Sequence, residues 1–141
     1  MPGQTIDNDE GAIVLSSPFA STRDDEDGVL TISEIAALKL DADLVILSAC
    51  NTAAGNDALG SEKLGGLSRA FFAAGARSML VTHWSVNDVA TRDLMTRFAA
   101  GYRQSAGKAT AMQAAMLALL KAEGGRNAHP YNWASFDLIG G

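Results

Sequence analysis

Cysteine is almost absent from this chain, because Cys50 is the only one among 141 residues. A single cysteine cannot form an internal disulfide, which is typical of a protein from a reducing compartment, so we expect a cytoplasmic location. Long apolar runs are absent too, and no basic segment is followed by an apolar stretch. The sequence therefore predicts neither a membrane span nor a secretion signal.

Positive charge and histidine are also scarce. Lysine and arginine number 11 against 16 aspartates and glutamates, which gives a net charge of −5, so no nucleic-acid-binding surface is predicted. No group of side chains has metal-ligand spacing. The loop "NTAAGNDALG" also lacks the spacing of a phosphate-binding or dinucleotide motif, so an enzyme acting on a small molecule is the least favoured functional hypothesis. We therefore predict no metal and no cofactor.

Apolar residues are plentiful at 48%, enough for one domain with a real core. Residues 1–10 are polar and patternless, which favours a flexible lead-in, and residues 11–141 favour a single domain. Branched apolar runs predict strands over 11–17, 44–49, 77–84 and 133–140, and helical spacing predicts helices over 31–40, 60–76, 87–102 and 108–124. This alternation indicates an α/β fold around a mostly parallel sheet.

Several helix ends carry their own signals. Thr31 and Glu34 have capping-box spacing, and Leu30 and Ile35 stand where a hydrophobic staple would close over that cap. Asn87 is a predicted N-cap and Gly75 a predicted C-cap.

Polar residues follow two of the predicted strands, in "SACNT" (48–52) and in "THWSVND" (82–88). Functional groups in an open α/β sheet gather beyond the carboxyl ends of the strands. If these two strands are parallel neighbours, both segments would line one crevice. Cys50 then has two interpretations: a small buried hydrophobe, which is common for free cysteine, or a nucleophile at the mouth of a small, Gly-rich loop.

Three blocks resemble one family: "DGVLTISEIAALKLDADLVILSACNTAAG", "GLSRAFFAAGARSMLVTHWSVNDVATRDLMTRF" and "HPYNWASFDLIG". They resemble the CHAT domain, from about residue 11 to the end; the resemblance implies a bacterial, caspase-like relative of cysteine peptidases that is close to separase. The resemblance implies a caspase-like three-layer sandwich with a Cys–His dyad, acting on a protein or peptide. It matches Cys50 to the nucleophile, Ser48 to the pocket floor and Asp88 to the acid that receives a basic side chain. Asp88 is equally explained as a first-turn helix carboxylate.

The catalytic histidine of this family has no counterpart in the chain. The family places it before the strand that matches 11–17, yet residues 1–82 contain no histidine. His83 could lie near Cys50 in space, but it matches a loop position of the family, and structural histidines are commoner. His129 precedes a proline and favours a turn or packing residue. A thiol with a pKa of about 8.5 is only a few per cent thiolate at neutral pH, so we predict negligible peptidase activity from this chain alone.

Two hypotheses follow. In the first, the chain is the C-terminal, nucleophile-bearing part of a CHAT-type cysteine peptidase whose N-terminal strands are missing, either as a fragment or as a degenerate protein. An unpaired sheet edge beside 11–17 would then favour association. In the second, the chain is a non-catalytic interaction module, and the resemblance implies TPR-type repeats in the parent protein.

Overall fold

A computed structural model describes residues 12–15, 28–47, 59–104, 107–122, 124–125 and 127–141. The elements are β1 (Ala12–Val14), β2 (Val29–Thr31), α1 (Ile32–Ala37), β3 (Val45–Leu47), α2 (Leu59–Ala73), β4 (Ser78–Thr82), α3 (Asp88–Arg103), α4 (Lys108–Lys121), the 3-10 turn η1 (Pro130–Asn132) and β5 (Phe136–Gly140). Every predicted strand and helix overlaps one of these elements. None of the described helices combines the length and the apolarity needed to cross a membrane.

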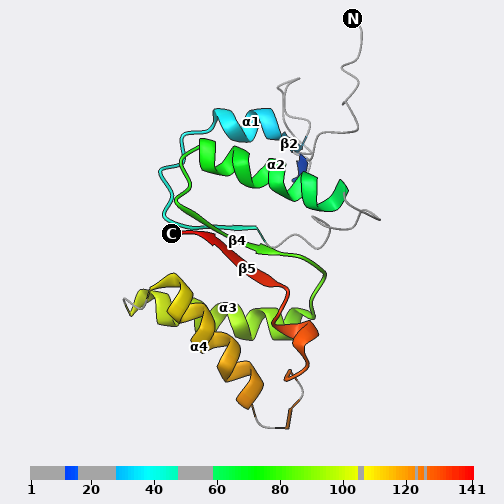
Figure 1. Ribbon diagram of the computed structural model, residues 1–141, viewed down its shortest axis with the longest axis vertical. Helices are drawn as coiled ribbons and strands as arrows, with labels where there is room; N and C mark the ends of the chain where they lie inside the picture. The colour runs from blue at the N-terminus through cyan, green and yellow to red at the C-terminus, as the bar shows by residue number, and fades with distance from the viewer. Residues whose placement is uncertain (1–11, 16–27, 48–58, 105–106, 123, 126) are drawn as a thin grey trace, which may run out of the picture.

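The main sheet has the order β3-β4-β5 and lies between two helical layers. Figure 1 shows α1 and α2 on one face of the sheet and α3 and α4 on the other. β3 and β4 are parallel neighbours, as the crevice hypothesis required, whereas β5 joins β4 antiparallel. The predicted three-layer α/β sandwich is therefore confirmed, and its described sheet is mixed.

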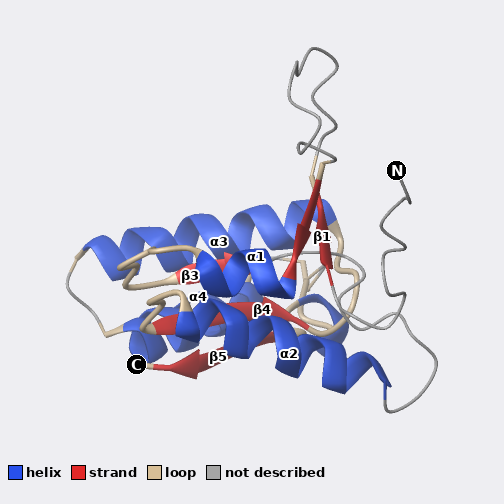
Figure 2. Cartoon of the chain, turned by 90° about the horizontal axis from the view of Figure 1, so that it is seen from above, coloured by secondary structure: helices blue, strands red, loops and turns tan. Residues whose placement is uncertain are grey.

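β1 and β2 form a separate antiparallel ribbon, with Ala12 opposite Thr31. Figure 2 shows this ribbon apart from the three strands of the main sheet. The sequence predicted an unpaired edge beside residues 11–17; β2 pairs with one side of β1, and no described strand pairs with its other side. β3 likewise pairs with β4 on one side and with no described strand on the other.

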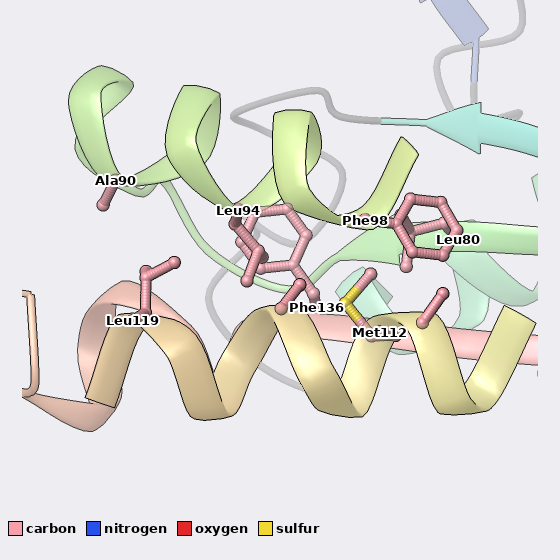
Figure 3. Close-up of a cluster of buried hydrophobic side chains, with 9 residues drawn as sticks. Leu80, Ala90, Leu94, Phe98, Met112, Leu119 and Phe136 are labelled. Carbon is pink, nitrogen blue, oxygen red and sulfur yellow. The ribbon is translucent and has the colours of Figure 1, made fainter. Parts of the chain in front are cut away.

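Alternation along β4 divides the apolar residues between two cores. Met79 and Val81 join Ile35, Leu67 and Phe71 in the α2-side core. Leu80 joins the α3-side core, whose buried members are Leu80, Ala90, Leu94, Phe98, Ala111, Met112, Ala115, Leu119 and Phe136. Figure 3 shows Leu94 and Phe98 of α3 pointing towards Met112 and Leu119 of α4. The methionine in this core needs no cofactor to explain it.

The predicted helix ends are confirmed. Glu34 Oε2 accepts the Thr31 N–H at 2.8 Å, and Thr31 Oγ1 accepts the Glu34 N–H at 3.3 Å, which completes the capping box. Asn87 caps α3 by accepting the Val89 N–H at 2.9 Å. Gly75 follows α2 with φ +105°, and its N–H donates to the Phe72 carbonyl at 3.1 Å.

A polar cluster connects the chain just before β3 to the helical layer formed by α3 and α4. The Asp43 carboxylate accepts hydrogen bonds from the Tyr102 hydroxyl of α3 and, at 2.9 Å, from Lys108 Nζ of α4. The Tyr102 hydrogen bond, and after it Lys108, lower the pKa of Asp43 below its ordinary value of 3.8. The same hydrogen bond raises the pKa of Tyr102 above its ordinary value of 10.0.

This cluster predicts an acid-sensitive contribution to stability. Because the pKa of Asp43 is lowered on folding, its carboxylate stabilises the fold above the ordinary value of 3.8 and loses that effect as pH falls through the folded value. In urea unfolding series, the stability advantage of the wild type over Asp43→Asn should therefore shrink below about pH 4. Tyr102→Phe removes the hydrogen bond that is the largest cause of the lowered Asp43 pKa, so this substitution should flatten the pH dependence. An advantage that stays constant down to about pH 2 would contradict the assignment.

Candidate active site

The register of β3 and β4 sets the position of the candidate site. Leu47, the last residue of β3, pairs with Val81, and β4 ends at Thr82. Both strands therefore end at the same edge of the sheet, which we call the carboxyl edge. Ser48 and Cys50 lie outside the described residues, so their placement stays a prediction, but Leu47 leads into them from this edge.

Asp88 is the first residue of α3 and follows Thr82, the last residue of β4, by six positions in the sequence. Its side chain is exposed, and it makes no hydrogen bond or ion pair with another described residue. The Asn87 side chain takes over the capping of α3, accepting from the N–H groups of Val89 and Ala90 at 2.9 and 3.4 Å. The Asp88 carboxylate is therefore not needed as a cap and remains available at the carboxyl edge.

An aromatic pair holds the 83–88 segment in place. Trp84 Nε1–H donates to the Tyr131 carbonyl at 2.9 Å, and the Tyr131 hydroxyl donates to the Ser85 carbonyl at 2.7 Å. The two ring centroids lie 6.0 Å apart. Because the contacts join positions 46 and 47 residues apart, they fix this segment against the chain that precedes β5.

His83 lies directly after β4, and its N–H donates to the Ser135 carbonyl at 2.9 Å. Its Nε2 is 3.6 Å from Asp137 Oδ2, and both side chains are substantially exposed. In β5, Asp137 alternates with Phe136 and Leu138, which contact the α3-side core. The imidazole and this carboxylate therefore lie on the α2 side of the sheet, at the carboxyl edge. Because Cys50 lies outside the described residues, its distance from His83 is not tested, and His83 stays a candidate base.

His129 caps the short turn η1, where its Nδ1 accepts the Tyr131 N–H at 3.2 Å. The prediction of a turn residue is confirmed. Its contribution to the site is indirect, because this turn presents Tyr131 to Trp84.

Sequence reasoning missed Asp137 and the Trp84–Tyr131 pair. The signal for Asp137 was present, since an acid interrupts the apolar run "SFDLIG" of an otherwise buried strand. The aromatic pair carried no local signal, because its partners are far apart in the chain. Within the described segments, no three histidine, cysteine, aspartate or glutamate side chains are grouped so that they could hold a metal ion.

Comparison with known proteins gives the family. The sequence model of the CHAT domain matches residues 3–141, so the chain belongs to the CHAT domain family, a caspase-like family related to peptidases. Tetratricopeptide repeat protein 28 of Mus musculus is 32% identical over 112 residues, 79% of this chain and 4% of that protein. The Homo sapiens protein of the same name is 30% identical over 112 residues, with the same coverage. The match thus spans 4% of the length of these relatives.

Proposed function

We propose that this chain supplies the nucleophile and the basic-residue pocket of a CHAT-type cysteine peptidase, and that the general base comes from polypeptide outside residues 1–141. The parallel register of β3 and β4 carries the proposal, because it brings the lead into Cys50 and the free Asp88 carboxylate to one edge of the sheet. Ser48 would form the floor of the pocket.

The proposed reaction is peptide-bond hydrolysis in two steps. The Cys50 thiolate attacks the peptide carbonyl carbon, the C–N bond breaks, and the leaving amine takes a proton from the imidazolium of the base. Water then adds to the thioester and gives one proton to the base, and the C–S bond breaks to release the carboxylic acid and restore the Cys50 thiolate beside the imidazolium. The backbone N–H of Cys50 would stabilise the oxyanion, while a second donor would come with the missing base.

Asp88 supports specificity for a basic side chain. A carboxylate without another partner attracts a lysine or arginine side chain most strongly when the bound peptide displaces water around it. The Trp84–Tyr131 pair holds the preceding residues, so the carboxylate would be presented from a fixed segment.

A thiol-reactive peptidyl probe tests the proposal in the longest natural polypeptide that contains these residues. A probe with arginine before the reactive group should label Cys50, and Cys50→Ala should remove labelling. Asp88→Asn should reduce the preference for arginine over glutamine by about tenfold or more. Asp93→Asn, an α3 carboxylate already paired with Arg97 at 2.8 Å, is the matched control and should keep the preference.

Two results would argue against this reading. Equal labelling of wild type and Cys50→Ala would remove Cys50 as the nucleophile. An unchanged arginine preference in Asp88→Asn would reduce Asp88 to a first-turn helix carboxylate. Loss of labelling in His83→Gln would instead make His83 the base, and the 141-residue chain would then be expected to label on its own.

A second candidate function is a non-catalytic interaction module. Two observations favour it. Residues 1–82 contain no histidine, and the two relatives are named as tetratricopeptide repeat proteins. Such repeats in the parent protein would then be the covalent neighbour of this domain. Reading the coding sequence upstream of Met1 separates the two: an in-frame continuation with a histidine at a strand end favours the peptidase, and a start codon with its own ribosome site favours the module.

A further inference from the structure

The Trp84–Tyr131 pair leaves apolar ring surface open to solvent at the carboxyl edge. Trp84 is 37% exposed and Tyr131 is 51% exposed. The polar atoms of both rings are already used, because Trp84 Nε1–H donates to the Tyr131 carbonyl and the Tyr131 hydroxyl donates to the Ser85 carbonyl. The carbon atoms of the rings are therefore what this surface offers to a ligand, and aromatic rings of this kind dominate many recognition sites.

The pair is fixed by contacts of its own. The Tyr131 N–H donates to His129 Nδ1 at 3.2 Å, which holds this residue within η1. The His83 N–H donates to the Ser135 carbonyl at 2.9 Å, so the chains that carry the two rings run side by side. A preformed surface loses little conformational freedom on binding, which favours affinity. The hydrogen bonds hold the turn, whereas the exposed ring faces are not needed for that purpose.

Three features follow one another along the carboxyl edge, in the strand order β3-β4-β5. Cys50 follows β3, Asp88 follows β4, and the turn with Tyr131 precedes β5, which starts at this edge. A peptide that crosses the edge from Cys50 past Asp88 therefore continues towards the Trp84–Tyr131 pair. Because Asp88 is proposed to receive the residue before the cleaved bond, this part of the peptide lies on the amino-terminal side of that residue.

The spacing of the strands sets which residue of the peptide reaches the rings. Neighbouring strands lie about 4.8 Å apart, and an extended peptide advances about 3.3 Å per residue. Successive side chains of an extended peptide point to opposite sides, so the next side chain on the same side as the basic one is two positions before it. That side chain lies about 6.6 Å further along the peptide, past the end of β4 and at the aromatic pair.

We propose that the Trp84–Tyr131 pair is a second specificity site, which binds an apolar or aromatic side chain two positions before the basic residue of the peptide. This inference rests on the proposed peptidase function and narrows its substrate class. The substrate is an extended peptide in which an apolar residue, a residue of any kind and a basic residue precede the cleaved bond. Binding removes apolar surface of both rings and of the peptide from water.

Thiol-reactive probes of three residues test the proposal in the longest natural polypeptide that contains residues 1–141. The probe phenylalanine–serine–arginine should label Cys50 about fivefold or more faster than serine–serine–arginine. The probe serine–phenylalanine–arginine places its ring on the opposite side of the peptide, so it should label at about the rate of serine–serine–arginine. Equal rates for the three probes, or a faster rate for serine–phenylalanine–arginine alone, would overturn the proposal.

A charge introduced at the rings should change the preferred residue. Tyr131→Lys keeps the backbone carbonyl that accepts Trp84 Nε1–H, and it should make glutamate–serine–arginine label faster than phenylalanine–serine–arginine. Leu117→Lys, at a 45% exposed position of α4, is the control and should keep the preference for phenylalanine. Ratios of rates within one variant cancel a general loss of labelling. An unchanged phenylalanine preference in Tyr131→Lys would count against the aromatic site.

Failure of this inference can be told apart from failure of the proposed function. If the phenylalanine and serine probes label wild type equally while Asp88→Asn still lowers the preference for arginine, the aromatic site is overturned and the peptidase proposal stands. If no probe labels Cys50, the peptidase proposal fails, and tryptophan fluorescence of the Trp133→Phe chain, whose remaining tryptophan is Trp84, decides the aromatic site. A spectral change with phenylalanine–serine–arginine amide but not with serine–serine–arginine amide would support the site, and no difference would overturn it.

Discussion

Replacing Phe98 with alanine should lower the free energy of unfolding by about 3–5 kcal/mol. The ring is 1% exposed and lies in the α3-side core between α3, α4 and β4. It also stacks on Tyr102, with ring centroids 6.0 Å apart. Removing it leaves a cavity that the surrounding helices cannot fully close, so the lost transfer energy and the cavity term add. Urea denaturation followed by circular dichroism measures the change.

Leu117→Ala is the control for that experiment. Leu117 also belongs to the α3–α4 layer, but it is 45% exposed, so its truncation should cost less than about 1 kcal/mol. If the two variants lost equal stability, α4 would not pack on α3 as described.

Gly75→Ala should destabilise the protein by about 2–3 kcal/mol. Gly75 has φ +105°, a backbone conformation that alanine rarely adopts. An added Cβ would also stand 3.1 Å from the backbone nitrogen of Asp41. The turn at Gly75 matters for the site, because its carbonyl accepts the Ala42 N–H at 3.2 Å and so aligns the chain before β3 with the chain before β4. Thermal and urea unfolding both report the loss.

Gly65→Ala is the matched control and should act in the opposite direction. Gly65 lies inside α2, and a Cβ there would meet no atom within 4 Å. Alanine should therefore stabilise the helix by about 0.5–1 kcal/mol. Opposite signs for two identical substitutions test backbone conformation directly, and a destabilised Gly65→Ala would show that α2 is packed differently.

Local signals in the sequence predicted the helix ends and the layered fold. The capping box of Thr31 and Glu34, the Asn87 cap and the turn at His129 need only residues a few positions apart, so they can be read from one segment. The alternation of strands and helices likewise predicted the three layers, because each apolar face must be covered.

Features that depend on distant pairing were not predicted. β2 is three residues long and ends at Thr31, the cap of α1, and the sequence predicted a helix start at Thr31 without a strand before it. The pairing of β2 with β1 was therefore not predicted, although the other side of β1 has no partner among the described strands. The antiparallel direction of β5 also has no local signature, since it depends on how the chain returns after α4.

The candidate site divides in the same way. The meeting of β3 and β4 at one edge was predicted from polar residues at both strand ends, and the register confirms it. The neighbours of His83 were not predicted, because Asp137 comes from a strand 54 residues later. Cys50 and Ser48 lie outside the described residues and remain predictions.

The direction of β5 has a practical consequence for experiments. Phe136 pairs with Thr82 at the carboxyl edge, and Gly140 pairs with Ser78 at the far end of the sheet. The chain thus finishes on the side remote from the proposed chemistry. A dye or a surface linker attached after Gly141 should therefore not obstruct the binding of a peptide at the carboxyl edge. This position suits the attachment of the protein in immobilised assays.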